Sequence, residues 1–232
     1  MGQVFSDSAL APNGRRVTIS CRDVELQPGW MWHGRLSSKT VAVGVTVGMA
    51  DYWDRAVEFN GATQAERIRY GNRPLIVGTD PQGSWMSVWQ GPHHSLVFGG
   101  AASVPTLSML VSILDDLSIV DRPEGLVVTP RPLSGLVLWS MIGYKFTSAG
   151  LISVLPRAEA ATLVPHERGQ ATEYGEVWAN SLRIDGQIRG RKYVHATATA
   201  ITIIDDDLGR VPEVTRSGQE ALLTSLDVRW DG

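Results

Sequence analysis

The chain of 232 residues contains a single cysteine, Cys21. One thiol cannot form an intrachain disulfide or a multi-cysteine metal site, so both are excluded. Lysine is also scarce, because only three of the 21 basic residues are lysine and the others are arginine. This bias is typical of a GC-rich genome and does not by itself indicate phosphate binding. The net charge of −3 is spread evenly along the chain, so no basic region predicts a nucleic-acid partner.

Long apolar runs and a leader segment are missing. No run approaches the roughly 18 residues that a membrane span requires, and no charged segment followed by an apolar one opens the chain. We therefore expect a soluble protein with no membrane partner and no export by a classical signal peptide. It would reside in the cytoplasm or be incorporated in a particle.

The common catalytic signatures are missing as well. There is no G-x-S-x-G nucleophile motif, and the glycines form neither the G-x-G-x-x-G nor the G-x-x-x-x-G-K phosphate loop. Glu173 and Glu176 lie three residues apart on an expected strand, where they would face opposite sides and not act as an acid–base pair. No cofactor is predicted. The pattern favours a protein that is not an enzyme, although pocket enzymes of the cyclase type often carry no motif.

One well-formed helix signal is present, at about residues 103–118. Ser103 suits the N-cap, and Pro105 falls in the first turn, where a missing N–H costs little. Apolar residues then recur at helical spacing, namely Leu107, Leu110, Val111, Leu114 and Leu117, with Met109 and Ile113 widening the band. We predict that this helix is central and covered on more than one side. Asp115 and Asp116, near its carbonyl end, should point to solvent or meet an arginine.

Strand signals dominate the remainder of the chain. Residues 16–23 alternate with period two, which places Val17, Ile19 and Cys21 on one face and predicts a buried, inert thiol. Other strands are expected at 41–47, 65–70 (an edge strand or a helical turn), 75–78, 85–90, 95–98, 126–129, 136–146, 151–155, 174–181 and 228–230. Short helices are expected between 48 and 61, at 156–163 and at 217–226, where Ser217 and Glu220 fit a capping box. Residues 1–14 are mostly polar and are predicted to form an arm.

The longest strand signal runs from Lys192 to Ile204. Along it, larger residues alternate with small ones, and Ala196, Ala198 and Ala200 share one face. Such a face permits close approach of a second layer, so we expect Ala198 to be packed beneath another element.

These signals predict an α+β fold that is dominated by strands, with mixed or antiparallel sheets packed around one central apolar helix. The prolines of the segment 129–132 interrupt both helix and central strand, and they mark the best candidate boundary. The chain then divides into a β-rich lobe with the central helix at 1–132 and a second β-rich lobe at 133–232, or it forms one continuous domain.

Titratable clusters offer no metal site. His93 and His94 are adjacent and would point to opposite faces of a strand, so they cannot readily bind one metal together. His195 is expected to be a sheet residue with a cross-strand partner. The carboxylates Asp205, Asp206 and Asp207 lack the spaced ligands and distal glutamate of a calcium loop, which favours a solvated turn.

Tryptophans offer a possible ligand site. Trp85 and Trp89 share one strand face, where they either pack in the core or form a stacking platform for a ring or a sugar. His93 follows them closely in the sequence.

We hypothesise a non-enzymatic interaction or assembly protein, a β-rich subunit of a larger homo- or hetero-oligomeric complex such as a virion or a tail-like particle. The motivating features are the long alternating strands, the small-residue faces and the polar arm. The alternative is a small-molecule-binding protein, or an enzyme of the cyclase or isomerase type. In that case Trp85, Trp89 and His93 would line an apolar pocket.

Overall fold

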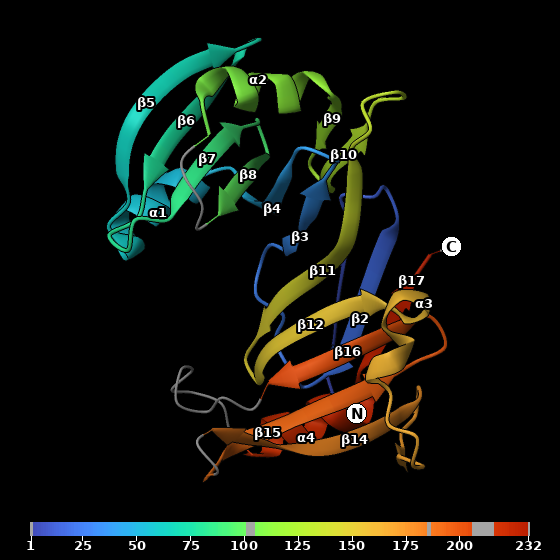
Figure 1. Cartoon of the computed structure of the whole chain (residues 1–232). Helices are drawn as coiled ribbons and strands as arrows, with labels where there is room; N and C mark the ends of the chain where they lie inside the picture. The colour runs from blue at the N-terminus through green and yellow to red at the C-terminus, as the bar shows by residue number, and fades with distance from the viewer. Residues whose placement is uncertain (1, 101–104, 185–186, 206–215, 232) are drawn as a thin grey trace. The chain divides into compact units, whose positions relative to one another are not determined.

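The computed structural model describes residues 2–100, 105–184, 187–205 and 216–231. Antiparallel strands make up most of the structure, and helices are few (Figure 1). This confirms the predicted β-dominated α+β class. Within the described ranges, no helix has both the length and the apolar character needed to cross a bilayer.

Two compact units divide the chain. The middle unit comprises Leu10–Gly14 and Met31–Met141, and the terminal unit comprises Met1–Ala9, Arg15–Trp30 and Ile142–Gly232. Most of the first 30 residues therefore belong with the C-terminal part of the chain. The division into lobes 1–132 and 133–232 concerns folding domains and stays a prediction.

The middle unit is built on antiparallel strands in the order β3-β4-β8-β7-β6-β5. These strands are β3 (Met31–Ser37), β4 (Ala42–Met49), β5 (Thr63–Tyr70), β6 (Arg73–Thr79), β7 (Trp85–Gln90) and β8 (His94–Gly100). Two further strands, β9 (Leu117–Arg122) and β10 (Gly125–Pro130), form a separate hairpin. Residues 65–70 thus lie in an edge strand, which is the first of the two predicted alternatives.

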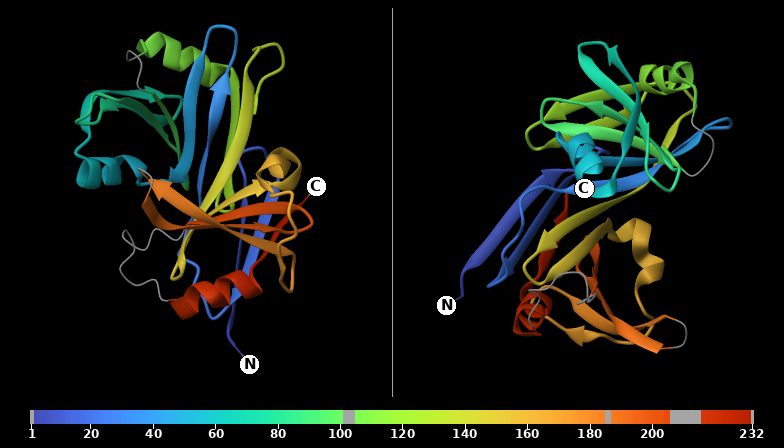
Figure 2. Two further views of the ribbon diagram at one scale, coloured as in Figure 1. Left: turned by 60° about the horizontal axis from the view of Figure 1, so that its bottom comes forward. Right: turned by 90° about the vertical axis from the view of Figure 1, so that its left-hand side faces the viewer.

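Helix α1 (Tyr52–Asn60) packs against this sheet (Figure 2). Its Trp53 lies in a buried cluster that also contains Ala56, Ala62, Ile76, Val88 and Val97. Gly78 makes room for the indole, since a Cβ at this position would lie 2.5 Å from an atom of the Trp53 ring. The helix ends at Gly61, whose φ of 65° is the left-handed conformation that glycine adopts without strain.

Helix α2 (Leu107–Asp115) is shorter and less covered than the predicted helix at 103–118. Thr106 is its N-cap and accepts from the backbone N–H of Met109, whereas Ser103 lies outside the described residues. Leu117 already belongs to strand β9. The helix buries one face, formed by Leu110, Ile113 and Leu114, while Met109 on the other side is 48% exposed. The idea of one central apolar helix is therefore not confirmed.

The carboxylate of Asp115 has an unexpected partner. Asp115 is exposed, which is the first of the two predicted alternatives, and it also accepts a hydrogen bond of 2.7 Å from the hydroxyl of Tyr70. Burial and this hydrogen bond raise the pKa of Tyr70 to about 12. The contact joins the end of the edge strand β5 to the end of α2.

The terminal unit contains two antiparallel sheets. The smaller sheet has the order β1-β2-β17, from β1 (Val4–Leu10), β2 (Arg16–Arg22) and β17 (Asp227–Trp230). The larger has the order β13-β14-β15-β16-β12-β11. Its strands are β11 (Val137–Thr147, which begins in the middle unit), β12 (Gly150–Pro156), β13 (Gln170–Ala171), β14 (Glu176–Ile184), β15 (Gln187–Ala196) and β16 (Ala200–Asp205). The helical segments are α3 (Arg157–Ala160), η1 (Ala161–Leu163) and α4 (Arg216–Ser225).

Strand β2 has the predicted alternation. Val17, Ile19 and Cys21 are buried on one face, and α4 packs against this strand. The thiol of Cys21 donates to the carbonyl of Val24 at 3.3 Å, and burial raises its pKa to about 11. The expected burial of the thiol is confirmed, and this burial disfavours the thiolate, which is the reactive form.

Residues 1–14 do not form an arm. Val4–Leu10 is strand β1, which pairs with β2. The prediction was wrong because a half-exposed edge strand needs few apolar residues. Only Ala9 of this strand is buried, while Phe5 and the charged Asp7 on the same face are half-buried, and Asp7 contacts Lys145.

The predicted strand from Lys192 to Ile204 is two strands. The chain reverses at residues 197–199, and β15 and β16 run antiparallel side by side (Figure 1). The hydroxyl of Thr197 accepts from the N–H of Ala200 at 3.1 Å and donates to the carbonyl of Val228 at 2.8 Å, which fixes the turn. Ala198 is therefore exposed in a turn and is not packed beneath another layer.

A buried lysine connects distant parts of the terminal unit. Lys145 on β11 is 1% exposed; its ammonium group pairs with the carboxylate of Asp7 and donates to the carbonyl of Gly29 at 3.1 Å. It also lies 5.3 Å from the centroid of the Trp30 ring, and the Trp30 Nε1 donates to Asp7 at 3.0 Å. Removing an ammonium group from water costs several kcal/mol, so these contacts are required for its burial.

The one-sided burial of α2 gives a stability prediction. Leu110→Ala should lower the free energy of unfolding by roughly 2–5 kcal/mol, because it leaves a cavity at a fully buried position. Met109→Ala, on the exposed side of the same helix, should cost less than about 1 kcal/mol. Urea unfolding of both variants measures the difference, and equal losses would contradict the described orientation of the helix.

The lysine cluster gives a second prediction. Asp7→Ala should lower the free energy of unfolding by about 3 kcal/mol, since it leaves the Lys145 ammonium buried without a counter-ion. Glu25→Ala, which removes an exposed carboxylate from the same unit, is the matched control and should have little effect. The double variant Asp7→Asn/Lys145→Met should recover part of the loss in a urea melt, because it removes both charges together.

Candidate functional site

The three residues proposed from the sequence lie in different surroundings. Trp85 and Trp89 are both on β7 and are 4% and 8% exposed. His93 is exposed in the turn before β8, and its backbone N–H donates to Asp121 at 2.9 Å. Trp85 lines a cavity, whereas Trp89 and His93 are not among the residues that line it. The structure therefore does not bring the three residues together at that cavity.

The cavity beside Trp85 lies in the middle unit and has a volume of about 600 Å³. It is bounded by the ends of β3, β4, β7 and β8 and by the first turns of α2. The lining residues are Arg35, Thr40, Val41, Ala42, Val43, Gly44, Trp85, Gly99, Gly100, Pro105, Thr106, Met109 and Ile113. Its size falls within the range of small-molecule pockets.

The neighbouring histidine, His94, is part of a structural contact. Its Nδ1 lies 2.8 Å from Oδ1 of Asp121, a carboxylate that is only 4% exposed. The other oxygen of Asp121 accepts from the backbone N–H groups of His93 and His94. One carboxylate thus fixes the turn between β7 and β8.

His195 is fully buried on β15, opposite Thr202 of β16 and Val177 of β14. Its Nε2 lies 3.2 Å from the hydroxyl of Thr172, and its Nδ1 has no partner among the described residues. Burial lowers the pKa of His195 to about 4, against a smaller opposing effect of Asp227. The imidazole is neutral at physiological pH and lies inside the sheet, in keeping with its expected structural role.

The remaining carboxylate candidates are separated from one another. Asp205 pairs with Lys192 at 3.2 Å, and Asp206 and Asp207 lie outside the described residues. Glu173 pairs with Arg22 at 2.6 Å, while Glu176 accepts from the backbone N–H of Gly169 at 3.2 Å. In the part of the chain that the structure describes, no cluster of three metal-ligating side chains is present.

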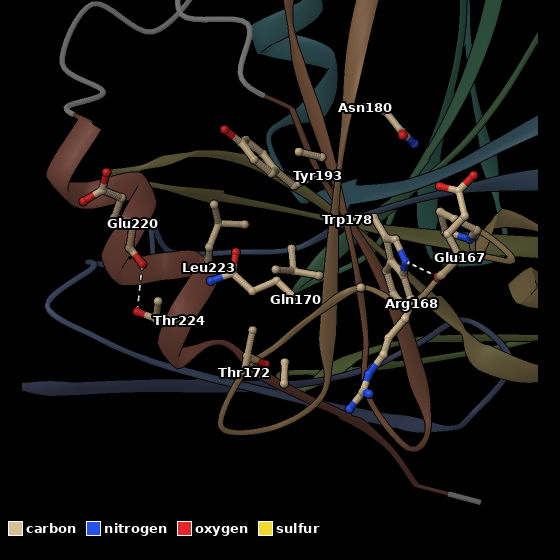
Figure 3. Close-up of a pocket in the computed structure, with 15 residues that line it drawn as sticks. Glu167, Arg168, Gln170, Thr172, Trp178, Asn180, Tyr193, Glu220, Leu223 and Thr224 are labelled. Carbon is tan, nitrogen blue, oxygen red and sulfur yellow. Dashed lines mark hydrogen bonds between the residues drawn. The ribbon is translucent and has the colours of Figure 1, made fainter.

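A larger groove, of about 650 Å³, lies in the terminal unit (Figure 3). One wall is helix α4, which contributes Glu220, Leu223 and Thr224 at i, i+3 and i+4, a single helix face. The opposite wall comes from β13, β14 and β15 and the segment before them. Its residues are Pro165, Glu167, Arg168, Gly169, Gln170, Ala171, Thr172, Val177, Trp178, Ala179, Asn180 and Tyr193.

The position of Trp178 organises this wall. Its Nε1 donates to the carbonyl of Glu167 at 2.7 Å, which holds the segment before β13 against the indole ring (Figure 3). Gly169 allows the close approach, since a Cβ there would lie 2.7 Å from the Trp178 ring. A second hollow of about 630 Å³, bordered by Arg157, His166 and the strand end at Ala196, shares Trp178, Glu167 and Arg168 with the groove.

Comparisons of the chain with known protein families, with curated proteins and with solved structures find no match. The site must therefore be interpreted from its own geometry.

The groove in the terminal unit was not predicted from the sequence. Its walls come from Trp178 and from α4, which are about 40 residues apart and are separated by strands β15 and β16, so no local pattern links them. One signal in the sequence could have indicated a close contact here, namely two glycines, Gly169 and Gly175, shortly before Trp178. The Trp178 ring approaches Gly169 closely, and the backbone of Ala196 approaches Gly175.

The buried imidazole gives a pH prediction. The folded protein keeps His195 neutral down to about pH 4, whereas the unfolded chain takes up this proton near pH 6.5. The unfolded state therefore binds more protons than the folded state between pH 6.5 and pH 4. The stability that the neutral, buried imidazole contributes above pH 6.5 is lost as the pH falls toward 4. The loss should amount to about 3 kcal/mol.

Urea unfolding between pH 8 and pH 4 measures this loss. His195→Gln should make the decline with falling pH shallower than in the wild type. His166→Gln, which removes an exposed loop histidine of the same unit, should leave the wild-type decline unchanged. If the decline were the same in all three proteins, the buried imidazole would not be its cause.

Proposed function

We propose that the protein is a non-enzymatic interaction protein, a subunit that binds an extended segment of a partner polypeptide along the free edge of β14. The observation that carries this proposal is the pairing of β14. Its nine residues pair with β15 on one side, but on the other side β13 covers only Glu176 and Val177. Beyond Val177, the outer edge of this strand has no neighbouring strand among the described residues.

The groove lies against this edge. Four consecutive residues of β14, Val177–Asn180, line it, although neighbouring residues of a strand point to opposite faces. A hollow that contacts all four must border the edge itself, where the unpaired backbone groups are. An added strand would gain affinity from main-chain hydrogen bonds, and the groove would select its side chains.

The groove suits a partner segment with an apolar or aromatic side chain. Tyr193 and Leu223 offer an apolar contact surface on one side of β14, and Trp178 offers a second on its other side (Figure 3). Asn180 and Gln170 add hydrogen-bonding groups at the rim. Trp178, Ala179 and Asn180 are uncharged, so the first residues of the free edge present no charge that would repel a partner strand.

The edge of the middle unit differs in this respect. Strand β5 carries Glu66, Arg67 and Arg69, of which all three are exposed, and its pairing with β6 shifts register between Gln64 and Glu66. Charges and bulges are the devices by which edge strands avoid pairing with another chain. Strand β14 has its own register shift farther along, between Leu182 and Arg183, so the contrast with β5 applies to the residues Trp178–Asn180 beside the groove and supports these as the edge that accepts a partner.

The test begins with selection of 12-residue peptides from a random library on the immobilised full-length protein. Selected peptides should bind with micromolar affinity in calorimetry and should slow amide hydrogen exchange in Val177–Asn180. Ala179→Lys, which places a charge on the free edge, should weaken binding at least about tenfold. Ala65→Lys, the same change at an exposed position of β5, is the matched control and should leave the affinity unchanged.

Peptides that bind both variants as tightly as the wild type would contradict the proposed edge, as would a selection that enriches none. Light scattering on the same proteins identifies the partner class. A mass above that of one chain, reduced by Ala179→Lys and not by Ala65→Lys, would make the partner a second copy of this chain.

A further inference from the structure

We propose, on the basis of the strand addition proposed above, that the groove at β14 selects its partner segment by one cationic side chain. This side chain, an arginine or a lysine, would lie opposite Ala179 and reach the carboxylate of Glu220 on α4. Three features of the groove support this choice: the faces on which its lining residues lie, the size of the side chains on the α4 face, and the charges that border that face.

Strand register divides the lining of the groove between two faces of the sheet. Ala179 pairs with Tyr193 of β15, so these side chains share one face, which is the face toward α4. Trp178 pairs with Val194 and packs with it in a cluster on the other face. In an added strand, the residue opposite Ala179 would share its face, and the two neighbouring residues would point to the Trp178 face. Only one of three consecutive partner residues can therefore reach α4.

The α4 face offers space for a long side chain at this position. Ala179 is exposed and has only a methyl group, while Tyr193 and Leu223 beside it are half-buried (Figure 3). An added residue would thus contact an aromatic ring and a leucine side chain. Such walls suit the alkyl part of lysine or arginine as well as a purely apolar side chain, and a tyrosine ring also attracts a cation. The charges around the groove decide between these possibilities.

Glu220 places a negative charge on the α4 face. It lies three residues before Leu223 on the same side of the helix, and its only printed ion pair is with Arg216 at 3.7 Å. Both side chains of this pair are exposed, so the pair contributes little and a cation of the partner can replace Arg216. The other charged lining residues, Glu167 and Arg168, also line the second hollow, which lies against the Trp178 face. The α4 face therefore favours a cation and disfavours an acidic side chain.

The test uses the 12-residue peptides selected on the full-length protein, restricted to those whose binding Ala179→Lys weakens, because these bind at the edge. Their aligned sequences should share an arginine or a lysine at one position and show no such preference at the two adjacent positions. In the tightest of these peptides, replacing the cation with methionine, which is unbranched and uncharged, should weaken binding about fivefold. Replacing it with glutamate should weaken binding at least about tenfold. Calorimetry at low ionic strength measures both effects.

Variants at position 220 identify the group that the cation contacts. Glu220→Gln should weaken the cationic peptide about fivefold and leave the methionine peptide unchanged, because only the cationic peptide loses a charge pair. Glu220→Lys should bind the glutamate peptide more tightly than the cationic one, a reversal that partial unfolding cannot produce. Glu25→Gln, at an exposed glutamate of the same unit that does not line the groove, is the matched control and should bind like the wild type.

Two results would overturn the cation preference and leave the strand addition intact. The first is a set of edge-binding peptides without a shared cation, and the second is a cationic peptide whose affinity Glu220→Gln does not change. A different result would overturn the strand addition itself, namely a selection in which Ala179→Lys weakens none of the peptides. The cation preference would then be wrong as well, since it requires a strand at this edge.

Discussion

The buried ammonium group of Lys145 sets the strictest requirement on the terminal unit. An apolar side chain can be accommodated in many arrangements, but a buried charge needs a counter-ion and hydrogen-bond acceptors at fixed positions. Asp7 supplies the charge and Gly29 supplies a carbonyl, although both are more than 100 residues away in the sequence. The first strand of the chain must therefore assemble with β11, which explains why the N-terminal residues belong to the same unit as the C-terminal ones.

The sequence predicted several elements in which one face alone is buried, although it missed β1. The alternation in residues 16–23 predicted strand β2 with its buried face, and the helix expected between 48 and 61 is α1, because burial and backbone conformation act locally there. The predictions failed where a side chain acts on the backbone or on a distant charge. The hydroxyl of Thr197 turns the chain within an unbroken alternating pattern, and Asp7 stabilises β1 through a lysine that no local pattern reveals.

The sequence predicted less of the candidate sites than of the fold, because contacts between distant residues bring the site residues together. Trp85 was identified from the sequence as a possible ligand contact, and it does line a cavity, but Trp89 and His93 do not. The other lining residues come from the three strands β3, β4 and β8, from the loop before β4 and from α2 and its start, and their proximity depends on strand register that the sequence leaves open. The groove at β14 depends on where β13 stops pairing, since three more residue pairs would cover Trp178, Ala179 and Asn180. Such a difference of three residues lies below what periodicity can resolve.

Three buried titratable groups of the terminal unit are poorly placed for general acid–base catalysis. General acid–base catalysis needs a proton donor or acceptor whose pKa is near the working pH and which substrate can reach. His195 is fully buried with its pKa lowered to about 4, the Cys21 thiol has its pKa raised to about 11, and Lys145 is held by Asp7. Each of these groups is committed to a contact inside the fold.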